Sequence, residues 1–492
     1  MADKKQSRAI MLQGTGSDVG KTVLVAGLCR LAARRGIKVR PFKPQNMSNN
    51  AAVADIPLAD GTGGEIGRAQ WLQALACCIP STVDMNPVLL KPQSETGSQI
   101  IVHGKVWGAA KGRDYQKLKP QLLGAVMESY ERLKAEADLV IVEGAGSPAE
   151  INLRDGDIAN MGFARKANVP VVLVGDIDRG GVIASIVGTH TILPNDDREM
   201  IAGFLINKFR GDISLFDEGL EQITQFTGWQ NFGVVPYLPE VANLPAEDSV
   251  ALEQALESQK NGAVVIVPVL SRIANFDDLD PLKLEPNVKL VFVRPGEPWP
   301  QDAKLVVLPG SKSTIADLIQ FKGLGWDVAL LNHVKRGGHV LGLCGGYQML
   351  GNVVADPEGI EGRVIEEAGL GLLDVATSLV PAKTVMNRTA IDAQTGQSLT
   401  GYEIHMGVTS GADTKRAMVH FDGVPDGAIS ENRLVRGTYL HGLFANDDWR
   451  AAYLREVGIL TAGMNYRSVV DAALDTLADH LERVISDKIF EI

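Results

Sequence analysis

A single cysteine stands where its neighbours would turn a buried strand sharply into a helix. The apolar residues 340–343 lead into Cys344, and Gly345 and Gly346 follow it. Small neighbours let the backbone bend and leave the thiol at the end of a strand, as in a nucleophile elbow. The N-terminus of the following helix would favour the thiolate, which is the attacking form. An isolated cysteine is more often a buried structural residue, but the Gly-x-Cys-Gly-Gly frame favours a nucleophile.

A cysteine nucleophile needs a base, and His441 is the first candidate. It follows a predicted strand at residues 437–440, and Gly442 comes after it. Residues at two strand ends of one sheet can meet although they are far apart in sequence. His405 is the rival base. Its neighbours, residues 401–407, are typical of a strand facing a pocket, which favours a structural or substrate-side role.

The same site would need hydrogen-bond donors for a tetrahedral intermediate. Gly310 follows a buried strand at residues 305–308, and such a tight turn can aim a backbone N–H into the site. Together with the N–H of Gly345 it would form an oxyanion hole.

A second kind of chemistry is indicated near the start of the chain. A buried strand at residues 9–13 is followed by a glycine-rich loop and a helix from about residue 23 to 35. A loop that ends in Gly-Lys-Thr between a strand and a helix cradles phosphates. Five residues rather than the standard four separate the first glycine of this loop from the last. We expect nucleotide contacts from Gly14, Thr15, Gly16, Ser17, Asp18, Gly20, Lys21 and Thr22.

Two strand ends extend this predicted nucleotide site. Glu143 ends an apolar strand at residues 138–142 and is placed to hold Mg²⁺ together with Thr22, unless it is a plain strand-end carboxylate. Asn207 and Lys208 end another strand, at residues 201–206, where Asn207 could contact the base of the nucleotide.

Polar loops between these strands are candidates for binding a substrate. Ligands gather at the carboxyl ends of parallel strands, and amides, cations and carboxylates there suit a large ligand with several carboxylates. Solvated loop chemistry is an equally good explanation for any single one, and Arg210 and Asp212 could equally cap a turn. The substrate-side candidates are Lys43, Gln45, Asn46, Asp176, Asp178 and Arg179.

The elements that must position these residues alternate between buried strands and helices. This alternation predicts an α/β protein with two doubly wound domains, each built on a parallel sheet. We expect a first domain with the phosphate loop at residues 1–250, a linker at 251–261 and a second domain with the cysteine at 262–450. A helical segment at 451–492 is expected to pack on the second domain.

Bulk composition limits the function classes. The 492 residues carry a net charge of −11, which argues against a nucleic-acid-binding protein. No apolar run approaches the length of a membrane span, and the first residues lack the apolar region of a signal peptide. The four cysteines form no CxxC pair, which indicates a reducing cytoplasm. Cys29, Cys77 and Cys78 lie in helical, apolar contexts and are expected in the core.

The combination of motifs resembles known families. The stretch from Gly342 to Gln348 and the late Tyr-Leu-His-Gly-Leu-Phe resemble class I glutamine amidotransferases, and the first half is similar to the dethiobiotin synthetase group of ATP-dependent ligases. Both halves in this order resemble the cobalamin-pathway amidases, over essentially the whole chain. The resemblance implies that the first domain is an ATP-dependent ligase and that the second is a flavodoxin-like amidotransferase domain. Class I enzymes usually carry Glu two residues after the histidine, where this chain has Leu443, so the third member of the Cys–His site is left unassigned.

The resemblance implies a glutamine-dependent ligase that uses ATP and Mg²⁺. Its substrate would be a corrinoid, adenosylcobyrinic acid a,c-diamide, amidated at the b, d, e and g carboxylates to adenosylcobyric acid. The alternatives are a cobyrinic acid a,c-diamide synthase and, from another class, a phosphate-loop regulatory ATPase with an inactive amidotransferase domain. The oligomeric state is open, with a homodimer as one option.

Overall fold

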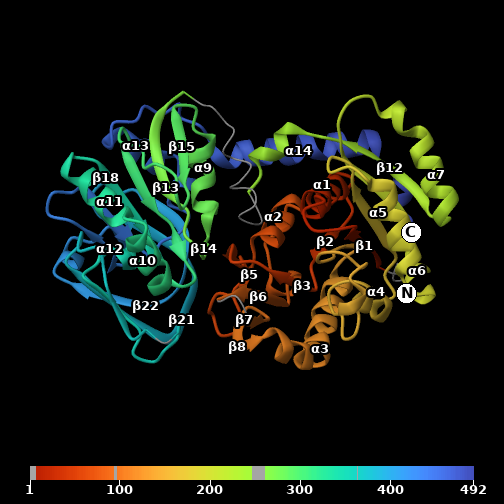
Figure 1. Ribbon diagram of the computed structural model, residues 1–492, viewed down its shortest axis with the longest axis horizontal. Coiled ribbons are helices and arrows are strands. Elements are labelled where there is room, and N and C mark those ends of the chain that lie inside the picture. The colour runs from red at the N-terminus through yellow and green to blue at the C-terminus, as the bar shows by residue number, and fades with distance from the viewer. Residues whose placement is uncertain (1–6, 94–96, 246–260, 363) are drawn as a thin grey trace.

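The computed structural model describes residues 7–93, 97–245, 261–362 and 364–492. It has two α/β halves that lie side by side (Figure 1). The linker expected at residues 251–261 lies, apart from Asn261, outside the described residues.

The first half is built on a six-stranded sheet in the order β12-β11-β10-β1-β9-β2, in which all neighbours pair in parallel. Its strands are short apolar runs buried on both faces, as parallel sheets covered by helices require. They span β1 Arg8–Gly14, β2 Val39–Phe42, β9 Leu139–Glu143, β10 Val171–Asp176, β11 Ile201–Phe209 and β12 Gln230–Pro236.

Side chains alternate across this sheet and pack into two separate cores. Ile10 and Leu12 of β1 join a cluster with the helix α1, whereas Met11 between them joins a cluster with α3, α4 and α5. The sheet is therefore covered on both faces, and the predicted doubly wound domain is confirmed. The helices of this half span α1 Lys21–Arg34, α2 Arg68–Ala76, α3 Gly112–Glu136, α4 Met161–Ala167, α5 Val182–Ile192, α6 Asn195–Arg198 and α7 Asp217–Thr227.

Two small sheets extend the first half toward the second. One has the order β3-β6-β7-β8, and the other pairs β4 with β5. Ala51 of β4 and Leu89 of β6 pack against Tyr402 and Ile404 of the second half, so an apolar cluster bridges the two halves. These strands span β3 Gln45–Met47, β4 Ala51–Val53, β5 Glu65–Gly67, β6 Val88–Pro92, β7 Gly97–Val102 and β8 Lys105–Lys111.

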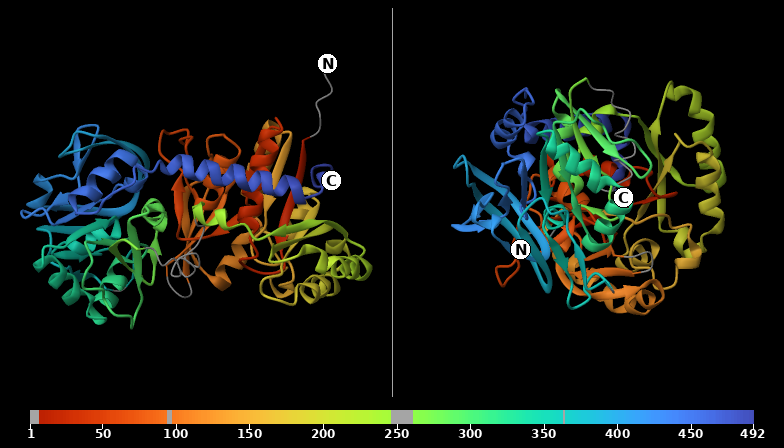
Figure 2. Two further views of the ribbon diagram at one scale, coloured as in Figure 1. Left: turned by 90° about the horizontal axis from the view of Figure 1, so that it is seen from above. Right: turned by 60° about the vertical axis from the view of Figure 1, so that its left-hand side comes forward.

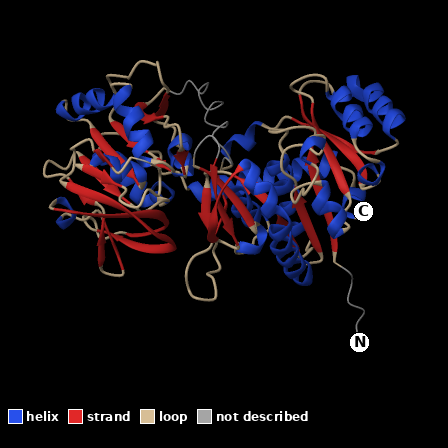
Figure 3. Cartoon of the chain, turned by 60° about the horizontal axis from the view of Figure 1, so that its bottom comes forward, coloured by secondary structure: helices blue, strands red, loops and turns tan. Residues whose placement is uncertain are grey.

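The second half has its own sheet, in the order β15-β13-β16-β18-β26-β25. The first five strands are parallel and β25 pairs antiparallel at the edge. Figure 3 shows strands of both halves flanked by helices. The strands span β13 Ala263–Pro268, β15 Val288–Val293, β16 Leu305–Leu308, β18 His339–Leu343, β25 Ala428–Ile429 and β26 Val435–Thr438, and the helices span α9 Asp280–Leu284, α10 Thr314–Gly323, α11 Trp326–Lys335 and α12 Gly345–Leu350.

A further sheet in the second half is dominated by a long hairpin. Its strands β21 and β22 pair antiparallel along most of their length, and Val385 of β21 accepts a hydrogen bond from the backbone N–H of Gly63 in the first half. The remaining strands span β14 Ile273–Ala274, β17 Gly310–Ser311, β19 Val353–Ala355, β20 Glu366–Ala368, β21 Val375–Asp392, β22 Ser398–Gly411, β23 Val419–Phe421 and β24 Val424–Asp426.

The C-terminal segment differs from the expectation. The helix α13 (Asp447–Glu456) does pack on the amidotransferase core, but α14 (Tyr466–Val484) crosses to the first half and lies on α1 (Figure 2). Arg30 of α1 pairs with Asp471 at 3.2 Å and with Asp475 at 2.8 Å. The apolar face of α14 buries Leu474, Leu477 and Leu481 in the same core cluster as α1.

Candidate active sites

The predicted elbow is present at Cys344, between the end of β18 and the start of α12. Cys344 has φ 50° and ψ −108°, a backbone conformation that few residues with a side chain adopt. A Cβ on Gly346 would lie 2.1 Å from the carbonyl oxygen of Leu308, and a Cβ on Gly342 would lie 2.7 Å from that of Gly346. The glycines are therefore required by close backbone approach, and they fix the thiol at the carboxyl edge of the sheet.

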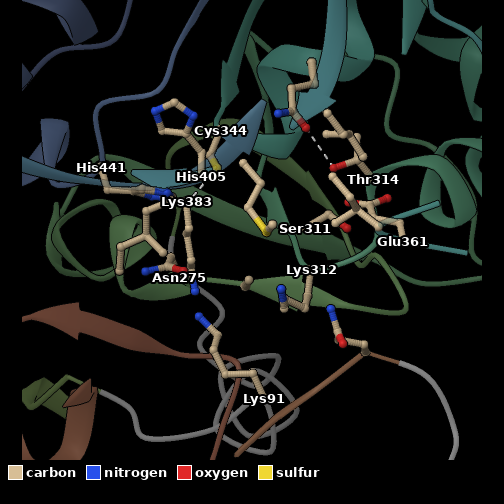
Figure 4. Close-up of a pocket in the computed structure, with 18 residues that line it drawn as sticks. Lys91, Asn275, Ser311, Lys312, Thr314, Cys344, Glu361, Lys383, His405 and His441 are labelled. Atoms are coloured by element: carbon tan, nitrogen blue, oxygen red, sulfur yellow. Dashed lines mark hydrogen bonds between the residues drawn. The ribbon is translucent and has the colours of Figure 1, made fainter. Parts of the chain in front are cut away.

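Neighbouring strands bring His441 to the cysteine. β18 and β26 are parallel neighbours in which Leu343 is opposite Thr438, and the N–H of Cys344 donates to the Thr438 carbonyl at 2.9 Å. His441 lies three residues beyond that register point and lines the same pocket as Cys344 (Figure 4). The thiol donates at 3.5 Å to the carbonyl of Ile404.

A buried acid orients His441. Its Nδ1 lies 2.7 Å from Oδ2 of Asp278, and because a carboxylate only accepts, Nδ1 carries the proton. Nε2, a buried atom, has no hydrogen-bond partner among the described residues, so it is the ring nitrogen that can exchange a proton with the thiol. Burial lowers the pKa of His441, but the charge and hydrogen bond of Asp278, with the contact to Cys344, raise it overall to about 10.

Asp278 is the residue that the sequence reading missed. It lies on η6 (Phe276–Leu279), a short 3₁₀ helix before α9, and its Oδ1 also accepts the N–H of Gly442 at 2.6 Å. Leu443, at the position usual for the acid, is fully buried in the core. In sequence, residues 275–281 are typical of a turn and a helix cap. The one available signal was the pair of adjacent acids at 277 and 278.

His405 occupies a different place. Its Nε2 lies 3.2 Å from Glu403 and its Nδ1 lies 3.0 Å from the carbonyl of Gly407, so both ring nitrogens have partners. Its ring stacks on Tyr439 with centroids 3.8 Å apart. Because these contacts hold the ring, His405 lines the pocket as a structural residue and His441 remains the better base.

The two oxyanion candidates lie on segments that contact each other. Gly345 is the first residue of α12, so its N–H has no partner within the helix. Gly310 lines the pocket, and a Cβ there would lie 3.4 Å from Cε1 of His441. A Cβ on Gly345 would lie 2.7 Å from the backbone nitrogen of Ser311, the residue after Gly310. Their role in receiving an oxyanion stays a prediction.

The thiol pocket is completed by the ligase half. It encloses about 50 Å³, and Lys91 and Gln93 line it together with Lys312 and Lys383 of the second half. Figure 4 shows Lys91 reaching toward the other two lysines. Burial, together with the neighbouring ammonium groups of Lys383 and Lys91, lowers the pKa of Lys312 to about 7.

A buried carboxylate holds two of these lysines. Glu65 is fully buried and pairs with Lys91 and, at 2.5 Å, with Lys383 from the second half. Burial would raise the pKa of Glu65, but the two ammonium groups lower it to about 2. The ion pair therefore ties the two halves together beside the thiol pocket.

The phosphate loop lies at a second and much larger cavity of about 900 Å³. Lys21 Nζ donates to the carbonyls of Gly16 and Gly146, both at 3.2 Å, and Gly20 has φ 92°. Ser17, Asp18, Gly20, Lys21, Thr22 and Asn207 line this cavity, whereas Gly14, Thr15 and Gly16 are not among its lining residues. A Cβ on Gly14 would lie 2.8 Å from Lys21 Nζ, so this glycine shapes the loop from behind.

Glu143 is the centre of the polar contacts in this cavity. Its Oε1 accepts from the Thr22 hydroxyl at 2.7 Å and from Lys43 Nζ at 2.8 Å, and its Oε2 accepts from Gln73 at 2.5 Å. One carboxylate and one hydroxyl beside a phosphate loop form a donor set that fits Mg²⁺, whose other ligands are phosphate and water oxygens. Thr22 and Glu143 are thus suited to the cation.

The other sequence candidates divide into two groups. Lys43, Gln45 and Asn46 line the large cavity. Asp176, Asp178 and Arg179 do not line it and lie in ion pairs with Lys208, Arg210 and Asp18, respectively. Asn207 donates at 2.8 Å to the carbonyl of Val19 in the phosphate loop. Asp212 caps η3 (Ile213–Phe216), as the turn-capping alternative predicts.

Two of the three other cysteines lie in the core, as expected, and one does not. Cys29 and Cys77 are buried, but Cys78 is exposed, because the chain leaves α2 there with φ 58°. None of the described helices is both long and apolar enough to cross a membrane.

Comparison with known proteins agrees with this division of the chain. Residues 10–251 match the CobQ/CobB/MinD/ParA nucleotide binding domain, and residues 264–449 match the CobB/CobQ-like glutamine amidotransferase domain. The chain is 67% identical over 479 residues to a cobyric acid synthase of Sinorhizobium fredii, 66% to that of Allorhizobium ampelinum and 65% to that of Rhizobium meliloti. Each alignment covers 97% of this chain and 98% of the relative.

Proposed function

Because this chain belongs to the cobyric acid synthase family, we propose that it amidates the b, d, e and g carboxylates of adenosylcobyrinic acid a,c-diamide. Glutamine supplies the nitrogen, ATP activates each carboxylate, and the product is adenosylcobyric acid. The observation that carries the proposal is the joining of two sites in one chain. A phosphate-loop cavity and a Cys–His–Asp site share an interface at which residues of the ligase half line the thiol pocket.

Ammonia production follows from the contacts of His441. Nε2 of His441 takes the thiol proton, and Sγ of Cys344 attacks the amide carbon of glutamine. The proton then passes to the departing nitrogen, which leaves as ammonia, and a thioester remains. Water activated by the same Nε2 hydrolyses the thioester to glutamate and restores the thiol. Asp278 holds the tautomer and stabilises the imidazolium, while the N–H groups of Gly310 and Gly345 receive the oxyanion.

Carboxylate activation belongs to the larger cavity. Lys21 and the loop N–H groups hold the nucleotide, and a substrate carboxylate takes the terminal phosphoryl group to become an acyl phosphate, leaving ADP. Ammonia attacks the acyl carbon and phosphate leaves. Mg²⁺, when bound through Thr22 and Glu143, would neutralise phosphate charge. Lys43, Gln45 and Asn46 line the part of the cavity that the corrinoid would enter.

The cavity volume suits two ligands together. About 900 Å³ is at the upper end for a single small-molecule site. A nucleotide together with one edge of a corrinoid fits that volume better than a nucleotide alone, which disfavours a purely regulatory ATPase. We also propose a cytoplasmic location, where ATP is supplied and free thiols such as that of Cys344 stay reduced.

Mass spectrometry tests the proposal directly. The enzyme is incubated with adenosylcobyrinic acid a,c-diamide, MgATP and glutamine labelled with ¹⁵N at the amide. We expect stepwise gain of four labelled amides. Turnover of cobyrinic acid but not of its diamide would instead assign the a,c-diamide synthase. ATP hydrolysis with an unchanged corrinoid would contradict both assignments.

A substitution of the phosphate-loop lysine tests the ligase step separately from the glutaminase step. Lys21→Ala should lose synthesis from glutamine and from ammonium salts alike, because carboxylate activation fails with either nitrogen source. Glutamine hydrolysis measured without nucleotide should persist in this variant. Synthesis from ammonia at the wild-type rate would contradict the assignment of the loop.

A further inference from the structure

One short helix touches both candidate sites. α2 has nine residues, of which eight are buried, and it lies where the two halves meet (Figure 1). Its first residue, Arg68, reaches the second half, and Gln73 reaches the nucleotide cavity. Arg68 and Gln73 are five residues apart, which is only about 7.5 Å along an α-helix. A small shift of α2 would therefore displace both side chains.

Arg68 contacts the two groups that flank His441. Its Nη2 lies 2.5 Å from Oδ2 of Asp277, the neighbour of Asp278, and donates at 2.7 Å to the hydroxyl of Tyr402. The ring of Tyr402 stacks on that of His441 with centroids 5.0 Å apart and an angle of 14°. The backbones of these two residues also exchange hydrogen bonds, of 2.9 and 3.2 Å. Arg68 therefore contacts the sequence neighbour of the acid that orients the histidine, and it also contacts the residue whose ring packs on the histidine.

The positive charge of Arg68 affects the protonation of Asp277 beside it. The titratable groups that act on Asp277 are Arg68 of α2, Asp278 of η6, His441 beyond β26, Tyr402 of β22 and Tyr466 of α14. The pKa of Asp277 is raised to about 6, because burial outweighs the opposing charge of Arg68 and the carboxylate of Asp278 adds to the increase. Without the guanidinium this pKa would rise further, and above that higher pKa two adjacent buried carboxylates would face one imidazolium and would hold its proton more tightly.

That proton has to leave His441 in each glutaminase cycle, because the departing ammonia receives it. Above the raised pKa that Asp277 takes without Arg68, an uncompensated second carboxylate slows this transfer, whereas below that pKa a proton replaces the missing positive charge. Loss of Arg68 is thus expected to harm glutamine hydrolysis most at high pH.

The other end of α2 contacts the candidate cation ligand. Gln73 is fully buried, and its Nε2 donates to Glu143 at 2.5 Å and to the backbone carbonyl of Thr22 at 3.4 Å. A nucleotide bound with its cation would change the charge beside Glu143, and the hydrogen bond from Gln73 would pass this change to α2, of which eight of the nine residues are buried.

We propose that Arg68 is a positioning residue for the Cys344–His441–Asp278 site, and that α2 carries the occupancy of the nucleotide site to it. The inference rests on the proposed function, in which the two sites act in sequence. In this proposal Arg68, a residue of the ligase half, holds the glutaminase site in its active geometry.

The first test is the pH profile of glutamine hydrolysis without nucleotide. Arg68→Met should lower kcat/KM at least tenfold at pH 8.5 and clearly less at pH 5.5. Arg68→Lys, which keeps the charge, should retain most of the activity at pH 8.5, and the double variant Arg68→Met/Asp277→Asn should recover part of what Arg68→Met loses. An equal loss at all pH values with no recovery in either variant would reduce Arg68 to a structural residue and overturn the proposal.

The second test is the reactivity of the Cys344 thiol. Iodoacetamide alkylation is followed by mass spectrometry of the Cys344 peptide, with and without a saturating, non-hydrolysable MgATP analogue, and added glutathione is the internal control for the reagent. Nucleotide should change the Cys344 rate at least threefold in the wild type, and this change should vanish in Arg68→Met and in Gln73→Leu. Binding of a fluorescent nucleotide verifies that each variant is loaded. No change in the wild type, or an undiminished change in both variants, would overturn the transmission by α2.

Neither readout requires a corrinoid, so the two proposals fail separately. If the wild type does not amidate the corrinoid but alkylation still responds to nucleotide through α2, the proposed function is wrong and the coupling stands. If amidation occurs and the alkylation test fails, only the coupling is wrong.

Discussion

At the scale of residues, the acid that orients His441 comes from a part of the chain with no spacing rule to predict it. Cys344 and His441 could be predicted because each follows an apolar strand with glycine beside it, and parallel strands end at one edge. Asp278 lies 163 residues before His441 on a 3₁₀ helix that is adjacent only through the fold. The sequence could show that position 443 lacks the acid, but finding its replacement requires knowing which loop crosses the edge.

The cysteine separates the two activities. Cys344→Ala should abolish synthesis from glutamine, because no thioester forms, and should leave synthesis from concentrated ammonium salt at raised pH, where free ammonia is present. Labelled corrinoid amides measured by mass spectrometry report both. Cys78→Ala is the matched control, since this exposed thiol is outside both cavities. If ammonia does not restore synthesis, the assigned division between the halves is wrong.

Asp278 gives a prediction in activity. Asp278→Asn should lower kcat for glutamine hydrolysis by about 10²–10⁴-fold, because the amide no longer fixes the tautomer or stabilises the imidazolium. Ammonia-dependent synthesis should be retained. An activity within threefold of the wild type would remove Asp278 from the site.

The same substitution gives a prediction in stability. The pKa of His441 is raised in the fold to about 10 from an ordinary value of 6.5. The stabilisation from this pair is therefore complete below pH 6.5 and is lost as pH rises toward 10. The difference in free energy of unfolding between wild type and Asp278→Asn should shrink between pH 6.5 and 10, as measured by urea titration. A constant difference would contradict the charged pair.

At the scale of elements, the apolar runs in the sequence predict the strands of both sheets. They do not predict which of the two cores a helix such as α14 packs against. The pattern of α14 predicts an amphipathic helix, and either sheet could have covered its apolar face. The shape and the charge of the α1 surface determine that α14 packs on the first half. A Cβ on Gly27 would lie 2.5 Å from a Leu481 methyl, so only glycine lets α14 approach, and Arg30 meets Asp471 and Asp475.

Removing apolar contact from this helix pair should be costly. Leu477 is 1% exposed, and Leu477→Ala should destabilise the ligase half by about 2–5 kcal/mol. Urea unfolding followed by circular dichroism measures the loss. Leu460→Ala is the matched control because Leu460 is 76% exposed and should change little. Equal midpoints for the two variants would mean that α14 does not contribute to that core.

At the scale of the whole molecule, the interface is part of both sites. Tyr402 and Ile404 bury an apolar cluster against the ligase half, and Glu65 holds Lys383 across the interface. Two domains could be predicted from the two runs of strands and helices. Their mutual orientation depends on contacts between loops such as those at Arg68 and Lys91, whose partners have no sequence signal.

The central carboxylate of this interface is open to a test. Glu65→Gln should destabilise the protein by about 3–5 kcal/mol, because two buried ammonium groups lose their counter-charge. The midpoint of thermal unfolding measures it. Asp60→Asn, which breaks the exposed pair with Lys105, is the control and should leave the midpoint unchanged. Similar behaviour of both variants would show that the buried pair does not hold the halves together.

The return of α14 to α1 also sets an order of events during synthesis. α1 leaves the ribosome early, but the helix that covers its face beside Gly27 follows roughly 450 residues later. At ribosomal speeds of about 5–20 residues per second, that face stays uncovered for roughly 20 to 90 s. The nascent ligase half is therefore a natural client for chaperones until the final helix closes it.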